Sequence, residues 1–552
     1  MPHHGRHGPC QINLQEGIYL SVARVEIYDT TLRDGAQTEG VSFSNEDKVD
    51  ILRHLDSFGI DFVEGGYPAS NPKDKAFFKA AQKIELSHTK LVPFGATRRP
   101  GKRAAQDPSM KALLDSGTEY VCTFGKTWDL HAKIALGVSL KENLGIIEDT
   151  VSFLAGKGKE VVFDAEHFFD GRKNNHNYAM RCLEIAEEAG AKYLVLCDTN
   201  GGNLPSEIAE AVAEVRRGHK VAVGIHAHDD CELAVANTLT AVDSGAVMVQ
   251  GTINGLGERC GNANLCSVVP SLMLKMGRKT SVSDLSALSG LSNFIGEVAN
   301  IMPDTGQAYV GRSAFTHKAG MHVSAVLKDP RTYEHIEPSL VGNERRVLVS
   351  ELSGTSNILA KARELGIEEE KDKGRSILET LKRMEAMGYQ FEAAEASFEL
   401  LVRRLRGENH RPFKLEGFRI FVDVSGDTMR SEASVRVVDP NGLVEHTASD
   451  GNGPVNALDK ALRKALLRFY PEIKEIRLID YKVRVIDAKA ATEAPVRVLI
   501  RSTDGEMTWT TVGVSGNIIE ASLLALIDSI EYKLLKSRKG GEVQGAAPAI
   551  GK

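Results

Sequence analysis

The sequence is poor in cysteine and contains no long apolar run. Its seven cysteines, in 552 residues, form no Cys-x-x-Cys pair, which argues against a disulfide framework or a zinc ribbon and favours a reducing compartment. No stretch approaches the ~18 consecutive apolar residues of a membrane span. The first 20 residues lack the apolar core of a secretion signal. We therefore expect a cytoplasmic protein without a membrane partner.

A large excess of charge of one sign is also lacking. The 68 basic and 74 acidic residues leave a formal net charge of -6, which argues against a nucleic acid as the main partner. The apolar share of 42% and the charged share of 26% are those of an ordinary globular protein. At ~100–200 residues per domain, the length predicts several domains.

From residue 24 onward, short β-branched runs alternate with helical patterns. Ser44-x-x-Asp47 resembles a capping box, and Gly59 stands where the helix after it should stop. The predicted strands are Val25–Thr30, Phe62–Tyr67, Leu91–Ala96, Tyr120–Phe124, Val161–Ala165, Tyr193–Cys197, Val221–His226 and Val247–Ile253.

Eight strand–helix units in about 250 residues predict an α/β fold of the (β/α)8 TIM barrel type. The alternative is a doubly wound open sheet, which favours a Gly-rich phosphate turn after its first strand. Here the first strand runs into Asp29-Thr-Thr-Leu-Arg-Asp-Gly35 instead. The sequence therefore favours the barrel.

The rest of the chain shows two further secondary-structure patterns. Helical patterns are expected at 285–301, 313–327, 356–365, 375–387 and 393–405. After about residue 413, a strand–turn–strand–helix unit occurs twice, with Gly451-Asn452 and Gly516-Asn517 ahead of the two helices. We expect a disordered N-terminal tail (1–23), a barrel domain (24–284), a helical linker subdomain (285–407), a C-terminal α+β domain (408–536) and a disordered tail (537–552).

Function in a barrel is expected at the C-terminal ends of its strands. His226 and His228 lie two apart at the end of the seventh strand, so both rings point to one side and can reach one cation. Asp34 is the expected third ligand, with Asp29 as a competitor that lies inside its strand. Asn262, in a Gly-rich loop, could orient a metal-bound water, or it could be a plain turn residue.

Three more polar residues stand at the same rim. Arg33 could clamp a carboxylate or form a rim salt bridge. Glu166 could be a base or a hydrogen-bond acceptor, and Thr199 offers a hydroxyl. His317 and His322 lie five apart in a predicted helix, so only one of them could face a given site.

These motifs, in this order, resemble the acetyl-CoA-dependent 2-oxo acid condensing enzymes, a family that includes the 2-isopropylmalate, homocitrate and citramalate synthases. The matching segments are Asp29-Thr-Thr-Leu-Arg-Asp-Gly-x-Gln37, His226-x-His228-x-Asp230, Gly257-Glu-Arg-x-Gly-Asn262, His317-Lys-Ala-Gly-x-His322 and Gly451-Asn-Gly-Pro-Val-Asn-Ala457. Segments 63–74 and 124–131 look most like the longer citramalate synthases.

The resemblance implies a Claisen condensation of acetyl-CoA with pyruvate, followed by thioester hydrolysis. It implies that Asp34, His226 and His228, with Asn262 nearby, hold Mg²⁺ or Mn²⁺. It also implies three catalytic residues and three residues that bind substrate. The catalytic residues are Arg33, Glu166 and His322, and the substrate-binding residues are Arg33, Gln37 and Thr199.

The resemblance further implies a homodimer, because in relatives the helix that carries His322 reaches over the partner subunit's barrel. It makes the C-terminal module a sensor of a branched-chain amino acid, with isoleucine expected as the feedback inhibitor in isoleucine biosynthesis. The alternatives are a 2-isopropylmalate or homocitrate synthase that takes a larger 2-oxo acid, a lyase that runs the cleavage, and a metal-binding, amino-acid-sensing scaffold.

Overall fold

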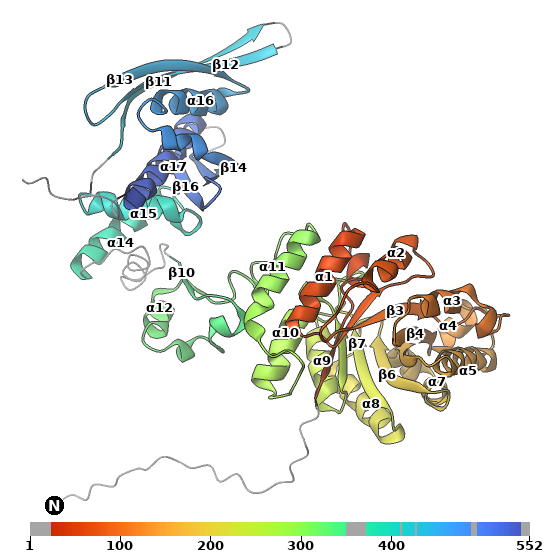
Figure 1. Cartoon of the computed structure of the whole chain (residues 1–552). Coiled ribbons are helices and arrows are strands. Elements are labelled where there is room, and N and C mark those ends of the chain that lie inside the picture. The colour runs from red at the N-terminus through yellow and green to blue at the C-terminus, as the bar shows by residue number, and fades with distance from the viewer. Residues whose placement is uncertain (1–23, 349–370, 409–410, 426–427, 487–493, 542–552) are drawn as a thin grey trace, which may run out of the picture. The chain divides into compact units, whose positions relative to one another are not determined.

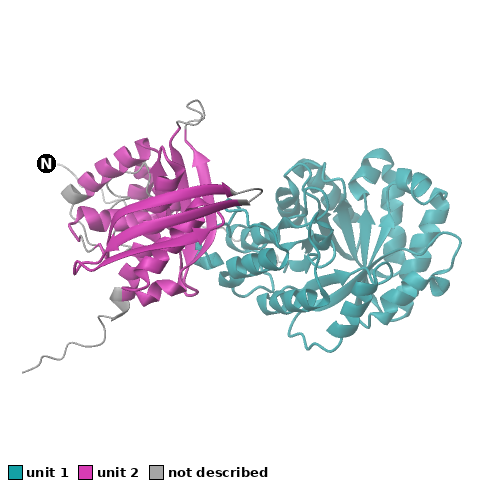
Figure 2. Cartoon of the chain, turned by 90° about the horizontal axis from the view of Figure 1, so that it is seen from above, with its two compact units in different colours: residues 1–315, 337–344 teal, residues 316–336, 345–552 magenta. Residues whose placement is uncertain are grey.

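The computed structural model describes residues 24–348, 371–408, 411–425, 428–486 and 494–541. Its contacts divide the chain into two compact units (Figure 2). Residues 1–315 and 337–344 belong to the first unit, and residues 316–336 and 345–552 to the second. The expected N-terminal tail, the predicted helix at 356–365 and the end of the C-terminal tail lie outside the described residues.

The first unit is built on a closed barrel of eight parallel strands in sequence order (Figure 1). The first strand pairs with the eighth, which excludes the open sheet, and every predicted strand is confirmed to within two residues. The strands are β1 Glu26–Asp29, β2 Phe62–Gly66, β3 Lys90–Ala96, β4 Tyr120–Lys126, β5 Glu160–Glu166, β6 Ala191–Asp198, β7 Ala222–Ala227 and β8 Met248–Gly251.

Helices surround this barrel. Helix α1 begins at the predicted capping box of Ser44 and Asp47 and ends at Gly59, which adopts a left-handed φ of 95°. The helices of this unit are α1 Asn45–Phe58, α2 Pro72–Ala81, α3 Pro108–Asp115, α4 Asp129–Ile134, α5 Leu140–Gly156, α6 Phe168–Asn174, α7 His176–Glu188, α8 Pro205–Gly218, α9 Ala234–Asp243, α10 Leu265–Pro270 and α11 Leu288–Val298.

The barrel interior changes character along its axis. Its lower part is packed with apolar and aromatic side chains, among them Tyr28, Phe62 and Tyr193. Because side chains alternate along a strand, the inward positions nearer the C-terminal ends follow two residues later. Polar side chains occupy many of these positions: Glu64, Asp164, His226 and Gln250.

The second unit starts with short elements. A two-stranded ladder joins β9 Thr316–His317 to β10 Arg346–Val347, and helix α12 covers Gly320–Val326. The prediction of one helix over 313–327 is therefore wrong in its first half, because backbone pairing with β10 holds residues 316–317 extended. Helices α14 Lys371–Ala386 and α15 Glu395–Leu405 follow, close to their predicted positions.

The C-terminal repeat is present and larger than expected, since each copy has an additional first strand. The first copy is β11 Lys414–Ser425, β12 Thr428–Val438, β13 Val444–Gly451 and α16 Pro454–Leu466. The second is β14 Arg477–Val485, β15 Val496–Thr503, β16 Thr508–Ser515 and α17 Ile518–Gly541. Helix α17 continues to Gly541, so the prediction of a disordered tail from residue 537 is wrong for its first residues.

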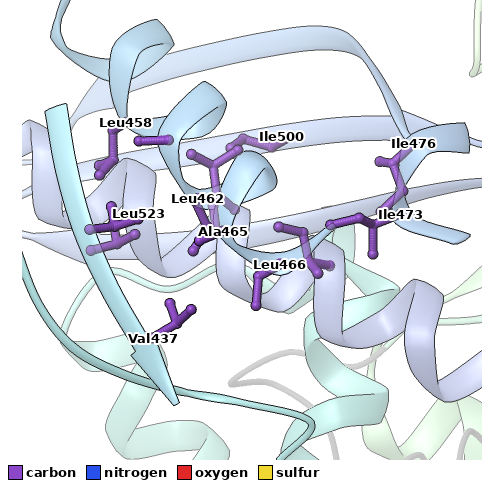
Figure 3. Close-up of a cluster of buried hydrophobic side chains, with 14 of the residues drawn as sticks. Val437, Leu458, Leu462, Ala465, Leu466, Ile473, Ile476, Ile500 and Leu523 are labelled. Atoms are coloured by element: carbon purple, nitrogen blue, oxygen red, sulfur yellow. The ribbon is translucent and has the colours of Figure 1, made fainter. Parts of the chain in front are cut away.

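The two copies share one hydrophobic core. Leu458, Leu462 and Leu466 recur along one side of α16 at helical spacing and lie beside Ile500 of β15 and Leu523 of α17 (Figure 3). Neither copy buries its apolar surface alone, which explains why the repeat occurs as a pair. In the described part of the chain, no helix combines the length and the apolar character needed to cross a membrane.

Candidate active site

The two histidines predicted to share a site do so. His226 lies in β7 and His228 directly follows the strand, and both rings are buried. Their Nε2 atoms are 3.3 Å apart. His226 Nδ1 donates to Gln250 Oε1 at 2.9 Å, which leaves the Nε2 lone pair available to a ligand.

Asp34 completes the group from the loop after β1. Its Oδ2 lies 3.7 Å from His226 Nε2 and 4.0 Å from His228 Nε2. Asn262 Nδ2 donates to Asp34 Oδ1 at 2.9 Å, and Arg33 Nη1 donates to Oδ2 at 2.7 Å. Residues far apart in the sequence thus converge on one carboxylate.

The protonation states of this group suit metal binding. Burial raises the pKa of Asp34, but Arg33 and the two imidazoles outweigh burial and hold that pKa well below its usual range. Burial, together with His228, lowers the pKa of His226 to about 3. Burial also lowers the pKa of His228. Near neutral pH the group therefore offers one carboxylate and two neutral imidazoles.

This donor set fits a divalent cation. One ligand atom from each of Asp34, His226 and His228 lies within 4.8 Å of the others. Asn262 Oδ1 is buried without a hydrogen-bond partner, so it is a further oxygen that needs a donor or a cation. Mixed imidazole and carboxylate ligands of this kind suit divalent metals.

Arg33 is held on two sides. Besides its bond to Asp34, its Nε donates to Glu64 Oε2, and its guanidinium lies 3.9 Å from the ring centroid of Phe94. Arg33 and Gln37 line a cavity of about 290 Å³ with Tyr67 and Phe94. Gln37 itself is exposed at the end of a short 3₁₀ helix, Gly35–Gln37.

Glu166 and Thr199 lie at neighbouring strand ends. Glu166, the last residue of β5, forms an ion pair with Lys126, the last residue of β4. Thr199 follows β6, and its Oγ1 accepts a hydrogen bond of 2.9 Å from the backbone N–H of His167. His167 has a left-handed φ of 57°, so this bond helps to fix a strained turn beside Glu166.

Asp29 does not join Asp34, His226 and His228, which we call the metal group. Its carboxylate accepts hydrogen bonds of 2.9 Å and 2.8 Å from the backbone N–H and the hydroxyl of Thr31. It is fully buried, and burial raises its pKa to about 7. The structure therefore gives Asp29 a local role in the turn after β1.

His322 belongs to the second unit. It is exposed on α12, and its ring stacks on Tyr333 with centroids 4.1 Å apart. His317 lies in β9, and its Nε2 is 3.1 Å from the buried Glu334, to which Arg345 also donates. The two histidines thus have different local roles, and they do not share a helix.

Comparisons with known proteins cover most of the chain. Residues 24–295 match the HMGL-like family, 309–388 the post-HMGL domain of homocitrate synthase, and 392–534 the LeuA allosteric (dimerisation) domain. An (R)-citramalate synthase from Geobacter sulfurreducens is 53% identical over 95% of this chain and 99% of its own. One from Aquifex aeolicus is 53% identical over 94% and 99%.

The chain belongs to the citramalate synthase family. A 2-isopropylmalate synthase from Methanocaldococcus jannaschii is 33% identical over 94% of this chain and 96% of its own. Identity is thus much higher to the citramalate synthases than to this relative over the same length. The comparison favours the subfamily suggested by segments 63–74 and 124–131.

In this member of the citramalate synthase family, the expected site residues fall within two different family matches. The HMGL-like match contains Arg33, Asp34, Glu166, Thr199 and the metal group, whereas His322 lies in the post-HMGL match. The LeuA match begins at residue 392 and so includes α15, which packs in the C-terminal unit through an ion pair of Arg404 with Asp528.

Sequence reasoning missed four polar residues that contact the site in this family member. Glu64 bonds to Arg33, Lys126 to Glu166, Gln250 to His226, and Asp164 to Gln250. Each of them lies an even number of residues from another inward-facing position of its strand. The period-2 alternation that found His226 and His228 could have found them too.

Proposed function

We propose that this protein condenses acetyl-CoA with pyruvate and hydrolyses the resulting thioester to (R)-citramalate and CoA. The observation that carries the proposal is the similarity to (R)-citramalate synthases along nearly the full length of both chains. The convergence of Asp34, His226 and His228 at the barrel mouth supports it, because the reaction needs an activated 2-oxo carbonyl.

Asp34, His226 and His228 are the residues that would hold the divalent cation, Mg²⁺ or Mn²⁺, with Asn262 Oδ1 facing the same group. A cation bound there supplies Lewis-acid polarisation of the 2-oxo acid carbonyl. The neutral imidazoles and the ionised carboxylate are ready to bind near pH 7, since their proton affinities are low.

Arg33 would stabilise the negative charge that develops on the carbonyl oxygen. Its Nε and Nη1 are fixed by Glu64 and Asp34, so the guanidinium plane is oriented before substrate arrives. Thr199 would bind the substrate carboxylate through its hydroxyl. Gln37 would bind substrate from the cavity that it lines with Arg33.

Glu166 and His322 are the candidates for proton transfer at the acetyl methyl and in thioester hydrolysis. Glu166 stands at the barrel mouth, where Lys126 orients its carboxylate. His322 is exposed on α12, so its ring is accessible to a substrate bound outside this helix. We propose that the protein acts as a homodimer and that His322 serves the partner subunit's barrel.

Two aromatic rings near Arg33 favour a small acceptor. Phe94 and Phe124 stack with centroids 5.0 Å apart, and the Arg33 guanidinium covers Phe94. Phe94 lines a cavity with Arg33, and a bulky aromatic ring there leaves less room for a branched acceptor than for the methyl of pyruvate. A 2-isopropylmalate or homocitrate synthase would need that space for its larger acceptor.

The decisive experiment is a panel of 2-oxo acids assayed with acetyl-CoA by release of free thiol. We expect the highest kcat/KM with pyruvate. A higher value with 2-oxoisovalerate or 2-oxoglutarate would instead identify a 2-isopropylmalate or homocitrate synthase. The absence of thiol release with every acid would favour the non-catalytic sensing scaffold.

We further propose a division of labour along the chain. Residues 24–284 would carry catalysis, 285–407 would form the helical linker and 408–536 would sense isoleucine, in a pathway that makes this amino acid. The match to an allosteric and dimerisation domain supports regulation by a small molecule. Gly451-Asn452 and Gly516-Asn517 precede α16 and α17, and the N-terminal ends of these helices, with their positive dipole ends, suit a ligand carboxylate.

A further inference from the structure

The side chain of Gln250 connects the metal group to a carboxyl that the mechanism above does not use. Gln250 lies in β8, directly opposite His226 in the β7–β8 register, and it is fully buried. Its Oε1 accepts from His226 Nδ1 at 2.9 Å, and its Nε2 donates to Asp164 Oδ1 at 3.0 Å. Both ends of the Gln250 amide are therefore hydrogen-bonded.

These three side chains form a hydrogen-bonded chain with a fixed direction. A carboxylate only accepts hydrogen bonds, so Asp164 requires the N–H end of the amide. The oxygen end then faces His226 and requires a proton on Nδ1. Because a neutral imidazole carries one proton, Nε2 keeps its lone pair and faces Asp34 and His228.

The arrangement is specific to one of the two histidines. His228 Nδ1 is buried without a hydrogen-bond partner, whereas His226 Nδ1 is held by the amide. The ring orientation and the tautomer of His226 are thus fixed by the barrel interior. Hydrogen-bond partners of this kind around metal-binding histidines typically contribute 10–100-fold to metal affinity.

We propose that Gln250 and Asp164 are positioning residues that hold His226 as its Nδ1–H tautomer and so prepare the site for a divalent cation. The inference rests on the proposed metal site and adds the residues that orient it. Burial and the neighbouring Glu64 raise the pKa of Asp164, so an alkaline pH favours the carboxylate form that accepts from Gln250 Nε2.

The test titrates Mn²⁺ alone into chelator-treated full-length protein at pH 8 and follows binding by calorimetry, without substrates. The Gln250→Met variant keeps the length of the side chain but removes both hydrogen bonds. We expect its Mn²⁺ affinity to be about 10–100-fold lower than that of the wild type. Wild-type affinity in this variant would overturn the inference.

A double variant tests the direction of the chain without removing a hydrogen bond. In Asp164→Asn with Gln250→Glu, the amide and the carboxylate exchange places, so residue 164 donates and residue 250 accepts from His226 Nδ1. We expect binding within a few-fold of the wild type. Binding as weak as that of Gln250→Met would overturn the inference. If Gln250→Met does not fold, a loss of 10-fold or more in the double variant would overturn it by itself.

Asn237→Leu is the matched control. Asn237 is a fully buried amide of α9 that donates to the Asn203 carbonyl at 2.8 Å and has no bond to the metal group. We expect its loss to leave Mn²⁺ affinity unchanged, and an equal loss of affinity in this control would overturn the inference. A wild-type protein that binds no Mn²⁺ would instead refute the metal site in the proposed function.

Discussion

Replacement of Phe124 by leucine should widen the acceptor range of the enzyme. Phe124 lies in β4, is half-buried, and stacks on Phe94, which contacts the Arg33 guanidinium at 3.9 Å from its ring centroid. Leucine has three fewer side-chain carbons than phenylalanine. The space gained corresponds to the two carbons by which 2-oxoisovalerate exceeds pyruvate.

The size of the effect follows from the value of one methylene in a substrate pocket. Accommodation of one carbon is worth about 1–3 kcal/mol, which corresponds to about 5- to 150-fold in relative rate. We therefore expect Phe124→Leu to raise the ratio of kcat/KM for 2-oxoisovalerate over pyruvate by at least about 5-fold. Initial rates of thiol release on both acids measure this ratio.

Phe163→Leu provides the control for this variant. Phe163 lies in β5, is fully buried, and packs over Gly125 on the outer side of the barrel wall. Its replacement should lower the melting temperature but leave the substrate ratio unchanged. An unchanged ratio in Phe124→Leu, in a folded protein, would refute the assignment of this aromatic wall to the acceptor pocket.

Four further outcomes are expected. Turnover should fall below about 1% of the wild-type value in each of His226→Ala, His228→Ala and Asp34→Asn. Circular dichroism should stay native, because residues at the strand ends serve chemistry rather than stability. Full activity in the double histidine variant would contradict the metal site. Mixed His322→Ala and Asp34→Asn chains should regain some activity, and no recovery after confirmed subunit exchange would remove His322 from the partner's site. Isoleucine should inhibit the intact protein and raise its melting temperature, and no effect from isoleucine, leucine or valine would refute the sensor. Burial raises the pKa of Asp29 to about 7, so the contribution of this residue to stability falls as pH rises from about 4 to 7, by about 4 kcal/mol at ~1.4 kcal/mol per unit. Urea unfolding should therefore show the Asp29→Asn variant gaining stability relative to the wild type over this range, and parallel pH profiles would contradict the burial effect.

Local patterns predicted most of the fold because each depends on neighbours in the chain. The alternation of β-branched runs with amphipathic helices predicted all eight barrel strands, and Ser44 with Asp47 marked the start of α1. The first strand of each C-terminal repeat was missed, although β11 and β14 are longer than many that were found. Much of both strands is exposed, so the contrast that marks a half-buried strand is weaker there.

The sequence by itself determined which residue types stand at the strand ends. His226 and His228 must share a face because a strand has a period of two, and this holds in any fold that keeps β7. The closure of the barrel decided the rest. It brought Asp34 to within 4.0 Å of both imidazoles across about 190 residues of chain, and it placed Gln250 between His226 and Asp164. Such contacts join three or four separate strands, and their geometry depends on the strand register around the whole barrel. The spacing of residues along the sequence does not predict that register.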